Sequence, residues 1–218
     1  MIPFARAIAA CAGAMAMAAS AAALPQSGAT ALRQGDAAAA KPIVTDVCAA
    51  CHGMDGNSVD PDIPSLAGQG EHYLREQLTE FRAQSRNGVM GAVAAALSAA
   101  DIRNLAAYFS QEIAKPGVAT DAALVGVGEA IYRGGVPAHD VPACASCHSL
   151  DGEGLAPEFP RLAGQHVAYV TRQLRAFRSD ARNSNPNAMM RVLAHKLSDA
   201  EIDAVAQYIA VLHRRERD

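Results

Sequence analysis

One run of residues occurs twice in this chain, and the repetition constrains the fold more than any other feature. CAACHGMDGNSVDPDIPSLAGQ, residues 48–69, recurs as CASCHSLDGEGLAPEFPRLAGQ, residues 144–165. At an offset of 96 the motifs align cysteine with cysteine and histidine with histidine: Cys48, Cys51 and His52 with Cys144, Cys147 and His148. Nearly half of residues 48–87 are identical to their counterparts, and the match resumes at an offset of 100 after a short insertion. The sequence therefore predicts two copies of one domain.

Each copy predicts the same helical layout. A helix leads into the CxxCH motif and a Gly/Pro-rich loop follows it. Residues 71–84 and 166–180 then place Tyr, Leu and Phe at three- and four-residue intervals, which indicates amphipathic helices. Residues 97–113 and 197–215 predict a further helix in each copy. Because no β pattern of any length occurs, we expect an all-α protein.

The last predicted helix of each copy opens with the spacing of a capping box. Its serine is followed three residues later by an acid, Asp101 after Ser98 and Glu201 after Ser198. At the other end of the second of these helices we expect three cationic side chains to complement the helix dipole: His213, Arg214 and Arg215.

The ends of the repeats define the expected domains. Residues 1–23 have an early arginine, an Ala/Met-rich apolar run and small residues before a cleavage point, which is typical of a secretory signal peptide. A membrane anchor is the weaker alternative, because no basic stop-transfer cluster follows. We then expect a flexible segment over 24–36, a first domain over 37–113, a Pro/Gly-containing linker over 114–123 and a second domain over 124–218.

Composition narrows the class of function. The chain has 19 Lys plus Arg against 22 Asp plus Glu, so it lacks the basic excess that nucleic-acid binding requires. Aromatic residues make up 5% and tryptophan is absent. Two small domains with so few large apolar side chains bury little surface by themselves. We therefore expect a large apolar cofactor in each half.

The CxxCH motif indicates what that cofactor is. Cysteines three residues apart lie on one face of a helical turn, and the next residue, histidine, can stand over the centre of a planar ligand. This pattern is typical of c-type haem attachment, with two thioethers and an axial histidine. A shared zinc site would have to join two motifs from separate repeats. A thioredoxin-like pair expects a βαβ setting, and disulfides across three-residue loops would be strained. Two covalent haems, at Cys48, Cys51, Cys144 and Cys147 with His52 and His148 on iron, are the favoured interpretation.

The sixth position on each iron favours a methionine. Met54 lies too near His52 along the chain to reach the opposite face of a haem, so Met90 is the candidate in the first half. The register of the repeat selects Met190 in the second, which leaves neighbouring Met189 for packing. His195 is an alternative ligand to Met190. A thioether ligand raises the reduction potential and suits electron transfer.

The axial histidines also need a partner for their second ring nitrogen. A carbonyl acceptor fixes the orientation of such a ring. Pro64 and Pro160 follow their histidines by 12 residues and can present a carbonyl rigidly. The alternative is that these prolines only form turns. The remaining histidines have no counterpart in the other half, and we expect them at the surface: His72, His139, His166 and His213.

With these residues, the chain resembles the dihaem class I cytochromes c, and specifically the cytochrome c4 family. The resemblance rests on CAACHGMDGNS and CASCHSLDGEG, on PSLAGQ and PRLAGQ, and on the methionines before LSAADIRNLAAYF and LSDAEIDAVAQYI. It implies two tandem all-α domains, each wrapped around one covalent haem c with His and Met ligands. It also implies close crossing of the first and last helices, by Gly128, Tyr132 and Tyr208 in the second half, with Ala40 and Val44 standing in for the glycine and the aromatic in the first. Pro42 is expected to shorten the first helix.

The resemblance further implies a function. Members of that family carry single electrons in the periplasm between redox protein donors and acceptors, such as membrane-associated respiratory complexes, often a terminal oxidase. We therefore expect no catalytic residues and no small-molecule substrate. Two alternatives stay open: a haem subunit docked on a periplasmic dehydrogenase, and a dihaem peroxidase with one iron open to small molecules.

Overall fold

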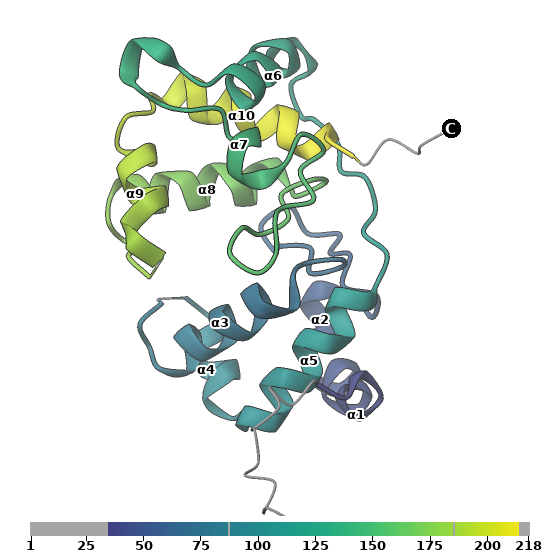
Figure 1. Ribbon diagram of the computed structural model, residues 1–218. Helices are drawn as coiled ribbons and strands as arrows, with labels where there is room; N and C mark the ends of the chain where they lie inside the picture. Colours follow the sequence, from purple (N-terminus) through teal and green to yellow (C-terminus); the bar gives the residue numbers. More distant parts are fainter. Residues whose placement is uncertain (1–34, 87, 185, 214–218) are drawn as a thin grey trace, which may run out of the picture. The chain divides into compact units, whose positions relative to one another are not determined.

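The computed structural model describes residues 35–86, 88–184 and 186–213, and the regular secondary structure of this part of the chain is helical (Figure 1). Two isolated β-bridges occur among these residues and no strand does, which confirms the all-α prediction. The expected signal peptide, most of the expected flexible segment, Arg214 and Arg215 lie outside the described residues. Within the described ranges, no helix combines the length and the apolar character needed to cross a membrane.

The helices repeat between the two halves of the chain. Those of the N-terminal half are α1 (Ala37–Ile43), the π-helical η1 (Val44–Cys48), α2 (Ala49–His52), α3 (Glu71–Arg82), α4 (Met90–Ala95) and α5 (Ala99–Gln111). Those of the C-terminal half are η2 (Ala122–Leu124), α6 (Val125–Gly134), η3 (Pro137–His139), α7 (Ala145–His148), α8 (Val167–Arg178), η4 (Pro186–Ala188), α9 (Met189–Ala194) and α10 (Asp199–Val211). In each half the last long helix packs against the first helix and against the helix that follows the loop.

The first helix continues past its proline instead of ending there. Pro42 lies inside α1, and the chain runs on as the π-helical η1 directly into Cys48. Proline lacks the N–H that an α-helix would use at this position, and a π-helical turn accommodates the changed hydrogen bonding. Ala40 and Val44 are both 0% exposed and belong to the core that α1 forms with α5.

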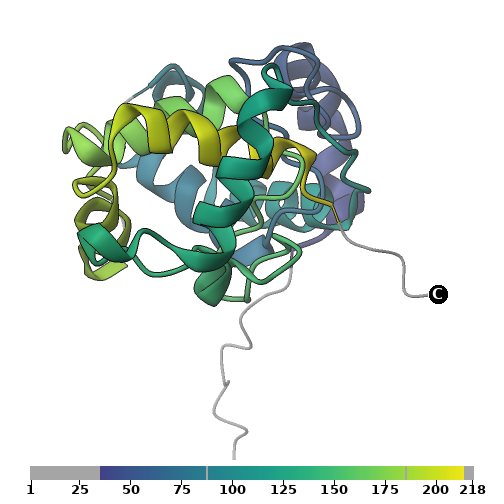
Figure 2. The same ribbon diagram turned by 90° about the horizontal axis from the view of Figure 1, so that it is seen from above.

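In the C-terminal half, α6 and α10 cross closely (Figure 2). A Cβ added to Gly128 would lie 2.0 Å from the carbonyl oxygen of Ala204, so only glycine permits this approach. The rings of Tyr132 and Tyr208 pack beside the crossing with centroids 5.4 Å apart. The crossing implied by the family resemblance is thus present.

The N-terminal ends of the last helix in each half are as the sequence predicts, but the C-terminal end of α10 is not. Both predicted capping boxes form: the Ser98 and Ser198 side chains accept from the N–H groups of Asp101 and Glu201, whose carboxylates accept in return. However, α10 ends at Val211, so His213 lies beyond its last turn, where its Nδ1 still lies 2.9 Å from the carbonyl oxygen of Val211. Leu212 leaves the helix because its side chain is buried against Gly152. At the start of the described chain, Asp36 caps α1 and its N–H donates to Asn104 Oδ1, so the end of the expected flexible segment is held in place.

The connection between the halves is anchored on both sides. Lys115 binds the N-terminal half through an ion pair with Asp55 and through its N–H, which donates to Asn57 Oδ1 at 2.8 Å. Five residues later, the N–H of Thr120 donates to Gln207 Oε1 of α10, also at 2.8 Å. The expected linker is therefore held by hydrogen bonds to both halves and by an ion pair to the N-terminal one.

Two glutamines join the halves reciprocally. Gln69 binds the backbone of Arg161 through both atoms of its amide, accepting from the N–H and donating to the carbonyl, each at 2.9 Å. Its counterpart Gln165 makes the same pair of bonds to the backbone of Ser65, at 3.0 and 2.9 Å. His166, expected at the surface, is also used here, because it is half-buried and its Nε2 lies 3.0 Å from the carbonyl of Ser58.

A second reciprocal contact, here called the guanidinium cluster, consists of Tyr73, Gln77, Arg86, Tyr169, Gln173 and Arg182. Each arginine donates to the tyrosine of the other half, and each glutamine oxygen accepts from both arginines. Each guanidinium also lies over a ring of its own half, Arg86 over Phe81 and Arg182 over Phe177. Two like charges are therefore buried between the halves on neutral acceptors and aromatic faces.

Candidate functional site

The two CxxCH motifs occupy equivalent short helices. His52 ends α2 and His148 ends α7, and both side chains are buried, at 6% and 7% exposure. In each half the histidine Nδ1 lies 2.9 Å from a proline carbonyl oxygen, that of Pro64 in the first and that of Pro160 in the second. The spacing of 12 residues noted in the sequence thus brings each proline carbonyl to its histidine.

This hydrogen bond determines what the ring can do. A carbonyl oxygen can only accept, so Nδ1 carries the hydrogen and Nε2 keeps its lone pair. Burial lowers the pKa of both histidines, and the hydrogen bond to proline opposes this only in part. Each ring is therefore neutral and oriented, with one nitrogen able to bind a metal.

The carbonyl groups of Pro64 and Pro160 are held in place by a turn that both repeats share. After each motif the loop turns at an Asp-Gly pair, and the glycine carbonyl accepts from two backbone N–H groups further along. Gly56 O binds the N–H groups of Leu66 and Ala67, as Gly152 O binds those of Leu162 and Ala163. Both glycines have positive φ, 71° and 73°, so glycine is favoured there. The identical Asp-Gly pairs in the two repeats are the sequence feature from which this turn could have been predicted.

The cysteines of both motifs are available for covalent attachment. All four are free thiols. Burial raises the pKa of Cys48 and of Cys144 to about 11, so these thiols stay protonated at neutral pH. Within the described ranges, no group of three or more His, Cys, Asp or Glu side chains is placed to hold a metal ion. The donor set of two thiols and one oriented imidazole in each half fits a haem c.

The methionines divide into two kinds. Met90 opens α4 and Met190 lies in the first turn of α9, at matching places and both half-buried. Met54 is 50% exposed and Met189 is 38% exposed, so Met189 is not the packing residue that the sequence suggested. His195, the alternative to Met190, is half-exposed and its Nε2 lies 3.3 Å from Asp180 Oδ2.

Comparisons with known proteins agree with this geometry. A family model described as cytochrome c matches residues 37–111 and again 128–213. Cytochrome c4 of Azotobacter vinelandii is 46% identical over 192 residues, covering 82% of this chain and 90% of that protein. A thiosulfate dehydrogenase electron acceptor of Thiomonas intermedia is 36% identical over 176 residues, covering 79% of this chain and 81% of its own. The crystal structure of reduced recombinant cytochrome c4 from Pseudomonas stutzeri matches with a TM-score of 0.78 at 43% identity, over 82% of this chain and 100% of that one.

Proposed function

Because this chain belongs to the cytochrome c family, with one such domain in each half, we propose that its two CxxCH motifs hold the haems and that it passes single electrons between redox proteins in the periplasm. Its domains bind haem c covalently, and it is a dihaem electron-transfer protein, not an enzyme. The observation that carries the site assignment is the duplicated hydrogen bond of His52 to Pro64 and of His148 to Pro160.

Each residue has one task in this proposal. Cys48 and Cys51, with Cys144 and Cys147, form the thioethers. His52 and His148 bind iron through Nε2, while Pro64 and Pro160 orient them. Met90 and Met190 would supply the sulfur ligands of the two irons. When bound, haem c supplies a one-electron couple between ferric and ferrous iron.

The chain's contribution is to favour electron transfer over reaction with small molecules. Because burial lowers the pKa of both imidazoles, each ring is neutral near neutral pH and its Nε2 is free to bind a metal. A thioether on the sixth position disfavours the ferric state and keeps small molecules from the metal. The peroxidase alternative, which needs an open iron, finds no support in the family.

Location and partners are the further parts of the proposal. The signal-like residues 1–23 favour export by a cleaved leader, and a membrane-associated respiratory complex, such as a terminal oxidase, is the acceptor that we propose. The similarity to a thiosulfate dehydrogenase electron acceptor favours a second candidate, in which the chain docks on a periplasmic dehydrogenase and takes its electrons. Purification from the periplasm with a stoichiometric flavin- or molybdenum-containing partner would select that candidate over a free carrier.

Spectroscopy of exported protein tests the ligands. We expect a pyridine haemochrome assay to give two c-type haems per chain, and the ferric protein to show the weak long-wavelength band of Met-ligated iron. Met90→His and Met190→His should each remove about half of that band. Met189→His is the matched control and should leave it intact, because this side chain is exposed. A full-strength band in both ligand variants would refute the assignment.

A further inference from the structure

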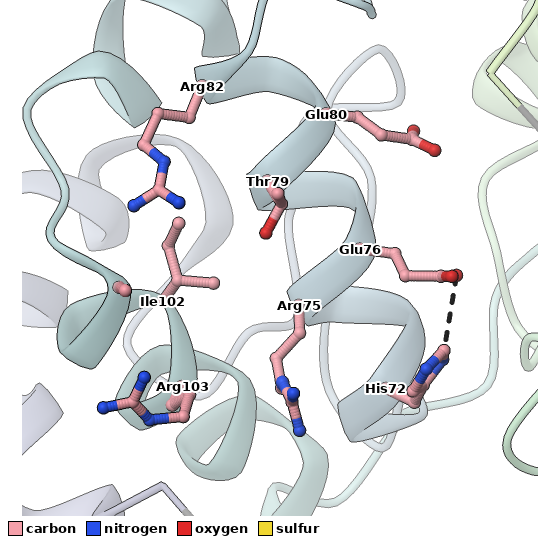
Figure 3. A pocket seen from close by; sticks show the side chains of 9 residues that line it. His72, Arg75, Glu76, Thr79, Glu80, Arg82, Ile102 and Arg103 are labelled. Carbon is pink, nitrogen blue, oxygen red and sulfur yellow. Dashed lines mark ion pairs between the residues drawn. The ribbon is translucent and has the colours of Figure 1, made fainter. Parts of the chain in front are cut away.

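The N-terminal half carries a groove between α3 and α5 (Figure 3). Its volume is about 380 Å³, and its walls include Arg75 and Arg82 from α3 and Arg103 from α5. Figure 3 shows Arg75 and Arg82 reaching from α3 toward α5, where Ile102 contributes an apolar side chain. This set of residues is called the α3–α5 groove below.

The arginines of the α3–α5 groove lack carboxylate partners in the described part of the chain. Arg82 Nη1 donates to the carbonyl of Leu97 at 3.3 Å. The guanidinium groups of Arg75 and Arg103 have no hydrogen bond or ion pair among the described residues. Of the two acids in the walls, Glu76 lies 3.7 Å from a ring nitrogen of His72, and Glu80 accepts from the hydroxyl of Ser184 at 2.8 Å. Neither partner is a fixed cation, so the lining carries three guanidinium groups beside two carboxylates. Figure 3 shows both glutamates on the side of α3 away from Arg82.

The same place in the C-terminal half carries ion pairs. Arg175 lies 3.0 Å from Asp199 and 3.0 Å from Asp203, and Arg178 lies 2.7 Å from Asp199. Here the helix that follows the loop supplies the arginines, and the last helix supplies the carboxylates. Two cations and two anions leave this cluster neutral.

The register of the repeat shows which residues of the N-terminal half stand opposite these two aspartates. At the offset of 100, Ala99 stands where α10 has Asp199, and Arg103 stands where it has Asp203. At the offset of 96, Arg82 matches Arg178, so an arginine that binds a carboxylate in one half lacks it in the other. Where the C-terminal half has two carboxylates, the N-terminal half has an alanine and an arginine, so guanidinium groups outnumber carboxylates in the lining of the groove.

The apolar cover of the C-terminal half is also absent from the N-terminal one. Val141, from the segment between α6 and α7, packs in one cluster with Ile202 and Leu197, joined by Val136. In the N-terminal half, α1, η1 and α2 follow one another without such a segment. Ile102, the counterpart of Ile202, is among the residues that line the groove, but it is itself buried, at 3% exposure.

We propose that the α3–α5 groove docks an acidic surface of a redox partner protein, whose carboxylates take the place that Asp199 and Asp203 fill in the C-terminal half. Guanidinium groups bind carboxylates through paired hydrogen bonds, and charge complementarity of this kind guides a partner to one face. Three guanidinium groups spread along a groove of about 380 Å³ suit several carboxylates of a protein surface better than a single small anion. This inference rests on the proposed function and adds to it that partners meet the N-terminal domain.

The test restores in the N-terminal half the carboxylates of the C-terminal one. Ala99→Asp with Arg103→Asp should supply Arg82 with an internal partner and close the groove. Binding of fluorescent hexaglutamate to the holoprotein is measured by anisotropy at low ionic strength. We expect salt-dependent binding to the wild type and about tenfold weaker binding to the variant. Electron exchange with an electrode coated by a carboxylate-terminated monolayer should slow in the same variant.

A charge-matched control separates the groove from net charge. Lys41→Asp with Ala122→Asp changes the charge equally at exposed sites outside the groove, and should leave hexaglutamate affinity within about twofold. Equal weakening in this control would overturn the proposal. So would displacement of the peptide by inorganic phosphate at matched ionic strength, which marks a small-anion site, or groove-dependent binding to vesicles of anionic lipid. The haem spectrum of each variant shows whether the haem sites are intact, so a failed docking surface is distinguishable from a failed haem assignment.

Discussion

Arg182 of the C-terminal half donates from Nη2 to the hydroxyl of Tyr73 of the N-terminal half at 3.0 Å. The reciprocal bond, from Arg86 Nη2 to Tyr169, measures 3.2 Å. Burial by itself raises the pKa of Tyr73, but the charges of Arg182 and Arg86 outweigh it, and the pKa is lowered. The guanidinium cluster thus joins the halves through two buried cations, and the carboxylate of Glu80 beside the cluster favours the charged form of Arg182.

Removing one hydroxyl group from this cluster should lower the stability of the folded protein. Tyr73→Phe leaves a buried N–H of Arg182 without its acceptor, and we expect the free energy of unfolding to fall by about 1–2 kcal/mol. Tyr108→Phe is the control, because Tyr108 donates from a more exposed hydroxyl to the carbonyl of Met54, and its loss should cost less. Urea unfolding of the holoproteins measures both. Equal stability of wild type and Tyr73→Phe would show that the cluster contributes nothing.

The glutamine pair predicts a pH-dependent defect. Gln165→Glu keeps the acceptor for the N–H of Ser65 but turns a carboxylate oxygen toward the carbonyl that the amide bound at 2.9 Å. We expect a loss of about 1–3 kcal/mol at neutral pH. The repulsion raises the pKa of the new carboxyl in the folded protein, so the deficit should shrink as the pH falls and the protonated group donates again. Gln111→Glu, at the exposed end of α5, should show little loss at any pH, and a deficit that grows toward acid pH would contradict this account.

The helix crossing of the C-terminal half supplies a matched pair of glycines. Gly128→Ala would bring a Cβ within 2.0 Å of the carbonyl oxygen of Ala204, and separating α6 from α10 should cost about 3 kcal/mol. Gly126, in the same helix, has no heavy atom within 4 Å of an added Cβ. Gly126→Ala should therefore leave stability unchanged or raise it by about 0.5 kcal/mol. Thermal unfolding of the two variants side by side is the measurement, and similar melting temperatures would argue against the close crossing.

The anchoring of the linker should depend on pH in the opposite sense to the glutamine variant. The ammonium of Lys115, with the N–H of Asn57, lowers the pKa of Asp55 from 3.8 to about 2. A lowered pKa in the folded state gives stability that is present above pH 4 and lost as the pH falls toward 2. Lys115→Met should cost less than about 1 kcal/mol at pH 7, because the pair is largely exposed. The carboxyl chemical shift of Asp55 in the reduced protein should titrate at higher pH in this variant. An unchanged midpoint would mean that Asn57 alone sets the value.

The sequence predicted those features that depend on residues close together in the chain. The four-residue capping boxes, the amphipathic stripes of α3 and α8, and the 12-residue distance from His52 to Pro64 are local patterns. The duplication added strength to each, because a pattern present in both repeats is rarely accidental.

Contacts between the repeats could not be predicted in this way. Gln69, Gln77 and Arg86 are identical to their counterparts, and identity between repeats does not tell a residue that binds within its own half from one that reaches across. The end of α10 was also missed, because the burial of Leu212 against Gly152 is a tertiary contact that overrides the favourable charges further on. Pro42 predicts a shortened first helix, since the sequence alone gives no sign that a π-helical turn will accommodate the missing N–H.

The reciprocal bonds of Gln69 and Gln165 have a consequence for how such a chain could arise. Because each glutamine binds the residue that corresponds to the other's target, the two contacting faces are one and the same surface used twice. A polypeptide with only one domain and this surface could pair with its own twin as a homodimer. Gene fusion would then only have to supply a covalent tether, and each half could afterwards diverge in sequence without a new interface having to be invented.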